Sequence, residues 1–213
     1  MGMQTFKVVC RKGQGEALGN LLRDIAYSYI PCWRPIAYSI DKKVSNILYS
    51  EDTILQDMIE FSCNLATLNF KVKQEINTDF VVEHYTFKSH LTSDDLKKGS
   101  VIECISEESV GLLDSVKEEP ITITIYYRKA FGVIPVSENI SFLRGKGESR
   151  KEVKVMSSNH TVLKSFAYKV EDYSLDEEEL EMSISTKSID EKELLNLSID
   201  TCIKTLSNFK NKI

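Results

Sequence analysis

Apolar and polar positions follow two different periods along the 213-residue chain, and each change of period marks a change of predicted element. Residues 6–9 have the composition of a strand, and after a turn at 12–15 the apolar positions of 16–29 recur at helical spacing. Pro31 ends this helix because proline has no backbone N–H to donate, and residues 36–40 resume an extended pattern. The chain therefore begins with a predicted strand, helix and strand.

A second helix is predicted over residues 51–67, where Ser50 to Asp52 place a capping residue and two acids before apolar residues at helical spacing. From 69 to 127 the period changes to two, most clearly at 121–126, where isoleucine alternates with threonine and tyrosine. We expect an antiparallel sheet in this middle third of the chain.

The last third predicts a long irregular segment, a pair of strands and a helix. Residues 137–163 have weak periodicity, and the strands at 165–171 and 180–186 are joined by an acidic turn. The final helix spans 190–209, and its apolar residues form one stripe. Asp190 and Glu193 give this helix a capping box.

The patterns at the two ends of the chain together indicate one α/β unit, whereas the pattern in the middle indicates strands. We therefore predict an α+β fold in which a discontinuous α/β domain, residues 1–45 plus 163–213, carries an inserted, mainly antiparallel β domain at 46–162.

Composition narrows the possible functions. The chain has 27 basic and 32 acidic side chains, a net charge of −5, which argues against a protein that wraps nucleic acid. Its sequence has no apolar stretch of the roughly 20 residues that span a bilayer and no secretory signal, so we expect a soluble protein that is neither membrane-inserted nor exported. Five widely spaced cysteines without a C-x-x-C pair indicate neither a zinc site nor a disulfide framework.

Candidate chemistry is sparse. Gly13, Gly15 and Gly19 imitate a dinucleotide-binding turn, but the third glycine is displaced by one position, so a small nucleotide-binding α+β enzyme is only a minor alternative. His84 and His90 lie about 20 Å apart along a strand-like segment, too far to share an ion. We predict no catalytic residue, no cofactor and no metal site.

A resemblance to a known family is carried by residues 12–23, Lys-Gly-Gln-Gly-Glu-Ala-Leu-Gly-Asn-Leu-Leu-Arg, with Ser28 to Pro31. This segment resembles the signature of the bacterial-type RNA polymerase alpha subunit, in which a glycine turn leads into an L-G-N-x-L-R helix. The similarity continues in order, at residues 51–72, 131–136, 166–171 and 188–209.

The resemblance implies a non-catalytic subunit of DNA-directed RNA polymerase, a nucleotidyltransferase complex. In that family two alpha copies dimerise through the first and last helices and form the scaffold on which the beta and beta-prime large subunits assemble for transcription. DNA would be reached only through the complex, without any membrane. The implied dimer interface is Leu18, Leu21, Leu22, Ile25, Leu195, Ile199, Ile203 and Leu206. The implied large-subunit docking surface is Asn20, Arg23, Asp24 and Tyr27.

Two departures from the family pattern refine this expectation. Asp24 follows Arg23 where the family commonly has a second arginine, so an ion pair at that position would have lost or exchanged its partner. The chain also ends shortly after Phe209, without the family's C-terminal DNA-binding domain, and 21 lysines against 6 arginines suggest an AT-rich genome. We expect a plastid-encoded subunit in the chloroplast stroma, with a bacterial cytoplasmic protein or an archaeal or eukaryotic heterodimerising alpha-like subunit as alternatives.

Overall fold

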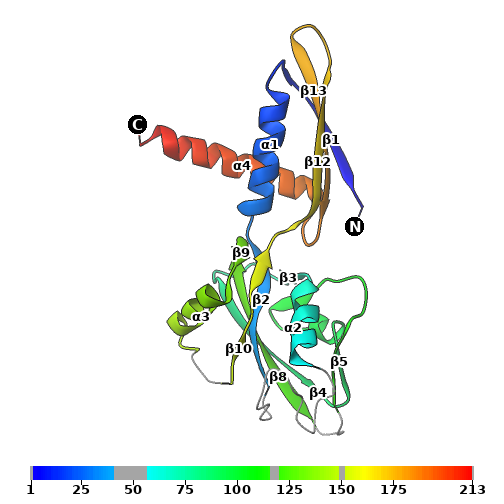
Figure 1. Cartoon of the computed structure of the whole chain (residues 1–213), viewed down its shortest axis with the longest axis vertical. Coiled ribbons are helices and arrows are strands. Elements are labelled where there is room, and N and C mark those ends of the chain that lie inside the picture. The colour runs from blue at the N-terminus through cyan, green and yellow to red at the C-terminus, as the bar shows by residue number, and fades with distance from the viewer. Residues whose placement is uncertain (1, 41–56, 116–119, 149–151, 213) are drawn as a thin grey trace. The chain divides into compact units, whose positions relative to one another are not determined.

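The structure, a computed structural model, describes residues 2–40, 57–115, 120–148 and 152–212. The chain forms two compact units, which are described separately: unit 1 contains Met1–Pro31 and Thr161–Ile213, and unit 2 contains Cys32–His160. Helices and antiparallel sheets occur together (Figure 1), so the predicted α+β class is confirmed.

Unit 1 is a three-stranded antiparallel sheet with two helices. The strand order is β1 (Gln4–Arg11), β13 (Glu177–Thr186) and β12 (Leu163–Asp172). Helix α1 (Gly15–Ser28) packs over β12 and β13, and helix α4 (Glu191–Lys210) packs against α1 and β13. The predicted helices at 16–29 and 190–209 thus agree with the structure to within a residue.

Alternation along β13 explains how this unit is held together. Leu180, Met182 and Ile184 are at most 2% exposed and face the helices, where Leu22 and Ala26 of α1 are also buried. Each large apolar side chain buried in this way contributes roughly 1.5–3 kcal/mol.

The opposite face of the same sheet is polar. Lys7 Nζ lies 2.7 Å from Glu179 Oε1 and 2.9 Å from Glu181 Oε2, and Lys169 Nζ lies 3.5 Å from Glu181 Oε2. The hydrogen bonds that Lys7 donates to Glu179, and then to Glu181, raise the pKa of Lys7. This face suits water, although such exposed ion pairs contribute little to stability.

Unit 2 is built on a larger antiparallel sheet. The strand order is β4 (Phe80–Phe87), β8 (Ile121–Ala130), β2 (Cys32–Ile40), β3 (Phe70–Val72) and β6 (Ile102–Cys104). The other described elements are the strands β10 (Lys154–Val155), β11 (Ser158–His160), β9 (Gly132–Ile134), β5 (His90–Thr92) and β7 (Gly111–Asp114), and the 3-10 helix η1 (Asp95–Lys98). β10 pairs with β2, β11 with β9 and β5 with β7, all antiparallel. Within residues 69–127, β3 pairs with β6, β4 with β8 and β5 with β7, so the predicted antiparallel middle third is confirmed.

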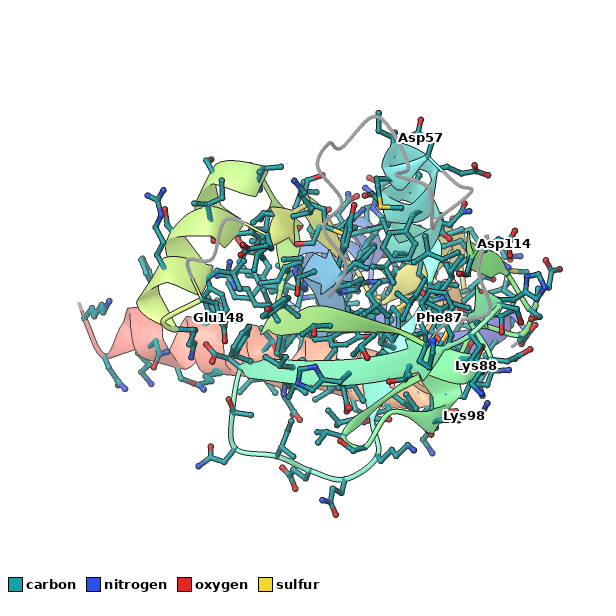
Figure 2. All side chains as sticks on the ribbon, turned by 90° about the horizontal axis from the view of Figure 1, so that it is seen from below. Asp57, Phe87, Lys88, Lys98, Asp114 and Glu148 are labelled. Atoms are coloured by element: carbon teal, nitrogen blue, oxygen red, sulfur yellow. The ribbon has the colours of Figure 1, made fainter. Side chains whose placement is uncertain are left out.

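Two helices cover the two faces of this sheet. α2 (Met58–Thr67) packs on the face that carries Ile125 and Tyr127, and α3 (Val136–Gly145) packs on the face that carries Tyr126. Figure 1 shows α3 and α2 on either side of β2. Figure 2 labels Asp57, which precedes α2, and Glu148, which follows α3.

A buried polar network fixes α3 and the end of unit 2. Asn139 Nδ2, on α3, donates to Ser158 Oγ (3.1 Å), and Ser158 Oγ lies 2.8 Å from His160 Nε2. His160 Nδ1 lies 3.0 Å from the carbonyl oxygen of Cys32, which can only accept, so this nitrogen carries the proton. The first and last residues of unit 2 are therefore joined by a hydrogen bond.

Two expectations about the fold differ from the structure, and a third is not tested by it. The sequence predicts that the end domain continues to residue 45, but β2 belongs to unit 2 because it pairs with β8 along its length, and the unit boundaries fall at 31/32 and 160/161. Residues 137–163 are not irregular throughout, since they contain most of α3. The predicted start of the second helix, at 51, lies outside the described residues, and α2 is described from Met58.

None of the helices in the described part of the chain is long and apolar enough to cross a membrane.

Candidate interaction surfaces

The glycine turn before α1 is closed by a carboxylate of this chain. Glu178, the buried second residue of β13, accepts a hydrogen bond from the backbone N–H of Gly15. The N–H groups of Gly15, Gly13 and Gln14 lower the pKa of Glu178, in that order of importance. The donors at this helix N-terminus, which would hold a phosphate in a nucleotide-binding turn, are thus directed at Glu178.

The surroundings of this turn are also unsuited to an anion. A hollow of about 400 Å³ beside it is lined by Gly13, Glu16, Val170, Glu171, Asp172 and Glu178. Four of these six residues are acidic and would repel a phosphate. The geometry therefore argues against the nucleotide-binding alternative.

Backbone conformation and close packing explain why these three positions are glycine. Gly13 has φ +88°, a conformation that favours glycine. A Cβ on Gly15 would lie 2.9 Å from Val170 Cγ1, and a Cβ on Gly19 would lie 2.7 Å from the Tyr168 ring. The glycines allow α1 to pack closely on β12.

The predicted docking residues lie on or beside the outward face of α1. Asn20, Asp24 and Tyr27 are exposed and lie opposite the buried side of the helix. Arg23 is half-buried; its Nη2 donates to Asn20 Oδ1 (2.8 Å) and its guanidinium lies 5.5 Å from the centre of the Tyr168 ring. Arg23 thus links Asn20 on this face to Tyr168 on β12.

The predicted dimer residues of α1 fall into two groups. Leu22 and Ile25 are buried within unit 1, at 9% and 7% exposure. Leu18 and Leu21 are 39% and 41% exposed, on the flank of the helix. An intermolecular role for α1 therefore depends mainly on Leu18 and Leu21.

The first part of α4 belongs to the core of unit 1. Asp190 Oδ1 caps the helix by accepting the N–H groups of Lys192 (2.9 Å) and Glu193 (3.1 Å). Leu194 and Leu195 are buried within the unit. This half of the helix needs no second chain to cover it.

The second part of α4 leaves its apolar side chains in solvent. Ile199, Ile203, Leu206 and Phe209 are 39%, 57%, 61% and 66% exposed. At 3.6 residues per turn they continue the buried face of Leu195, and we call these four residues the α4 stripe. Figure 1 shows this end of α4 extending past α1, away from the sheet.

The two histidines considered in the sequence have separate partners. His84 Nδ1 lies 2.9 Å from Thr124 Oγ1, and His90 Nδ1 lies 2.6 Å from Asp114 Oδ1. Among the residues that the structure describes, no group of three or more His, Cys, Asp or Glu side chains could hold a metal ion.

The structure also exposes apolar residues that the sequence analysis did not select. Val8 on β1 is 49% exposed, Val133 on β9 is 72% exposed, and Leu175 in the β12–β13 turn is 92% exposed. Leu175 could have been noticed as an apolar residue inside an acidic turn. Val8 could not, because its exposure depends on which strand lies at the sheet edge.

Comparison with known proteins gives one relevant similarity. No family model matches the chain. The chain is 28% identical over 132 residues to a protein of Campylobacter jejuni subsp. doylei named DNA-directed RNA polymerase subunit alpha. The match covers 62% of this chain and 38% of that relative, so the chain matches well under half of the relative's length.

Proposed function

We propose that this chain is an alpha-like subunit of a multisubunit DNA-directed RNA polymerase and acts as the dimeric scaffold on which the large catalytic subunits assemble. The similarity to a named polymerase alpha subunit supports an alpha-like role. The chemistry of nucleotide addition would belong to the large subunits, because this role requires only surfaces that bind other chains.

The observation that carries the proposal is the α4 stripe. Four large apolar side chains on one helix face, each between 39% and 66% exposed, are unusual on the surface of a chain that acts alone. Leu18 and Leu21 of α1 add further exposed apolar surface in the same unit. Two copies would cover these residues by packing their first and last helices against one another.

The polar surface of α1 is the proposed site for a large subunit. Asn20, Asp24 and Tyr27 lie on the outward side of the helix, away from the sheet. Glycines 15 and 19 hold that helix firmly on β12, which gives the surface a fixed position.

The direct test is affinity purification of the tagged chain from its source, followed by native mass spectrometry. We expect an assembly of two copies with two very large subunits. The identities of those subunits would also test the predicted plastid location. A lone chain of 24.3 kDa without a large partner would contradict the proposal.

The dimer itself is tested by a charge in the α4 stripe. Ile203→Asp should abolish dimerisation, because the new carboxylate would be buried without a partner. Leu197→Asp is the matched control, since Leu197 is 40% exposed on the opposite side of the same helix and should tolerate the change. Sedimentation equilibrium measures the result, and a dimer that survives Ile203→Asp would show that this face is not the interface.

A further inference from the structure

β1 extends the helix-bearing face of the unit 1 sheet beyond the helices. In the strand register Phe6 lies opposite Met182 and Val8 lies opposite Leu180, and residues directly opposite each other point to the same face. Met182 and Leu180 are 2% exposed beneath the helices, whereas Val8 is 49% exposed. We call Phe6, Val8 and Cys10 the β1 shelf.

The β1 shelf lies on the side of α1 that carries its exposed leucines. Gly19 and Arg23 face Tyr168 on β12, the strand at the other edge of the sheet. Leu18 and Leu21 are turned from them by roughly 150° around the helix. They therefore lie on the side of α1 that is turned from β12, the side on which β13 and β1 follow in the sheet.

The two faces of β1 differ in chemistry. The shelf carries no charged side chain, whereas Lys7, on the other face, is paired with Glu179 and Glu181. Val9 shares the face of Lys7 and is 44% exposed, close to the value for Val8. An apolar partner would accordingly bind the face of Val8 and not the face of Val9.

We propose that the β1 shelf is the seat for the α4 stripe of a second copy of this chain, an inference that rests on the dimeric scaffold proposed above. The lengths match: the stripe spans about 15 Å from Ile199 to Phe209 at 1.5 Å per residue. The shelf spans about 13 Å from Phe6 to Cys10 at 3.3 Å per residue. Two-fold symmetry then gives each copy one stripe to donate and one shelf to receive it.

The surface area that a stable dimer must bury also supports a second copy as the partner of the β1 shelf. A specific interface buries roughly 800 Å² per partner, contributed by about 20–30 residues. On the proposed dimer side the helices contribute six exposed apolar side chains, Leu18, Leu21 and the four of the α4 stripe, which is fewer than the residues of such an interface. The β1 shelf adds Val8, which is 49% exposed, and the half-buried Phe6 and Cys10 to this surface.

The test compares two neighbouring valines. Val8→Lys should raise the dissociation constant of the dimer at least about tenfold, because it places a charge against the α4 stripe of the second copy. Sedimentation equilibrium measures this constant. Val9→Lys should leave the constant unchanged. Val8→Thr, which keeps the side-chain shape and the preference for strands, should weaken dimerisation by a smaller factor, and circular dichroism confirms that each variant is folded.

Each other outcome overturns a defined part of the proposal. If Ile203→Asp separates the copies but both Val8 variants dimerise normally, the shelf is not part of the interface and the scaffold proposal stands. If Val8→Lys and Val9→Lys weaken the dimer equally, the assigned face is wrong. If the unmodified chain is monomeric at all concentrations, both proposals fail.

Discussion

At the scale of single residues, the segment that carries the family resemblance is explained by packing. Gly13 supplies a turn conformation that other residues rarely adopt, and Gly15 and Gly19 let β12 approach α1. Glu178 then caps the helix from β13. A pattern that imitates a nucleotide-binding turn is therefore a means of fixing one helix on one sheet.

Gly19→Ala tests this interpretation. The new Cβ would lie 2.7 Å from the Tyr168 ring, so we expect a loss of about 1–2 kcal/mol in the free energy of unfolding, measured by urea denaturation. This loss is net of the roughly 1 kcal/mol by which alanine favours a helix. Gly145→Ala is the control, because nothing lies within 4 Å of a Cβ there, and it should not destabilise the protein. Equal stabilisation by both changes would contradict the packing explanation.

At the scale of elements, the sequence predicted the helices with a broad apolar buried face and missed α3, whose buried face is partly polar. α1 and α4 follow the helical spacing of their leucines and isoleucines, and their bounds were predicted closely. α3 buries only Asn139 and Leu143, so its sequence lacks an apolar period. Asn139 is satisfied by Ser158 Oγ (3.1 Å), by the carbonyl oxygen of Met156 (3.0 Å) and by Arg128, all distant in sequence. No local pattern could have predicted that arrangement.

The interface residues show the same limit. Helical spacing grouped Leu22 with Leu18 and Leu195 with Ile199, but it could not separate residues that the chain covers itself from those that it leaves exposed. That distinction depends on where α4 crosses α1, which is a property of the tertiary structure.

The polar network around α3 predicts a pH dependence of stability. Burial lowers the pKa of His160 from 6.5 to about 4, although its hydrogen bond to Cys32 acts in the opposite direction. Between these values the unfolded chain binds a proton that the folded chain does not. The free energy of unfolding should therefore fall by up to about 3 kcal/mol as the pH drops from 6.5 to 4.

The contribution of His160 can be isolated with His160→Asn, which keeps a donor near the position of Nδ1 but does not titrate. The variant should be less stable than the unmodified chain at pH 7, and its stability should fall less steeply between pH 6.5 and 4, as measured by urea denaturation at each pH. Parallel pH profiles for the two proteins would refute the assignment to His160.

At the scale of the whole molecule, function is proposed to come from surfaces and not from an enclosed site. Unit 1 presents an apolar surface made of the α4 stripe and the α1 flank, and a polar surface on the outward side of α1. These surfaces have different chemistry, so they suit different partners. A substitution in one should leave binding at the other intact.

Asp24→Arg tests that separation. Asp24 has 73% of its side chain exposed, so the variant should fold normally and change the affinity for a large subunit without changing the dimer mass. Asp200→Arg makes the same change of charge on an exposed position of α4 outside the stripe, and should alter neither. Surface plasmon resonance measures the affinity and native mass spectrometry the dimer. A change in dimer mass with Asp24→Arg would refute the assignment of the polar surface.

The hydrogen bond between His160 Nδ1 and the carbonyl oxygen of Cys32 has a consequence for the evolution of the chain. Because this bond, 3.0 Å from His160 Nδ1 to the oxygen of Cys32, keeps the first and last residues of unit 2 adjacent, unit 2 is joined to the rest of the chain as a long loop is. Its length and composition can therefore change without altering the distance between its two ends. The 129 residues from Cys32 to His160 thus form an exchangeable cassette, which evolution could shorten, extend or replace while the sheet and helices of unit 1 stay unchanged.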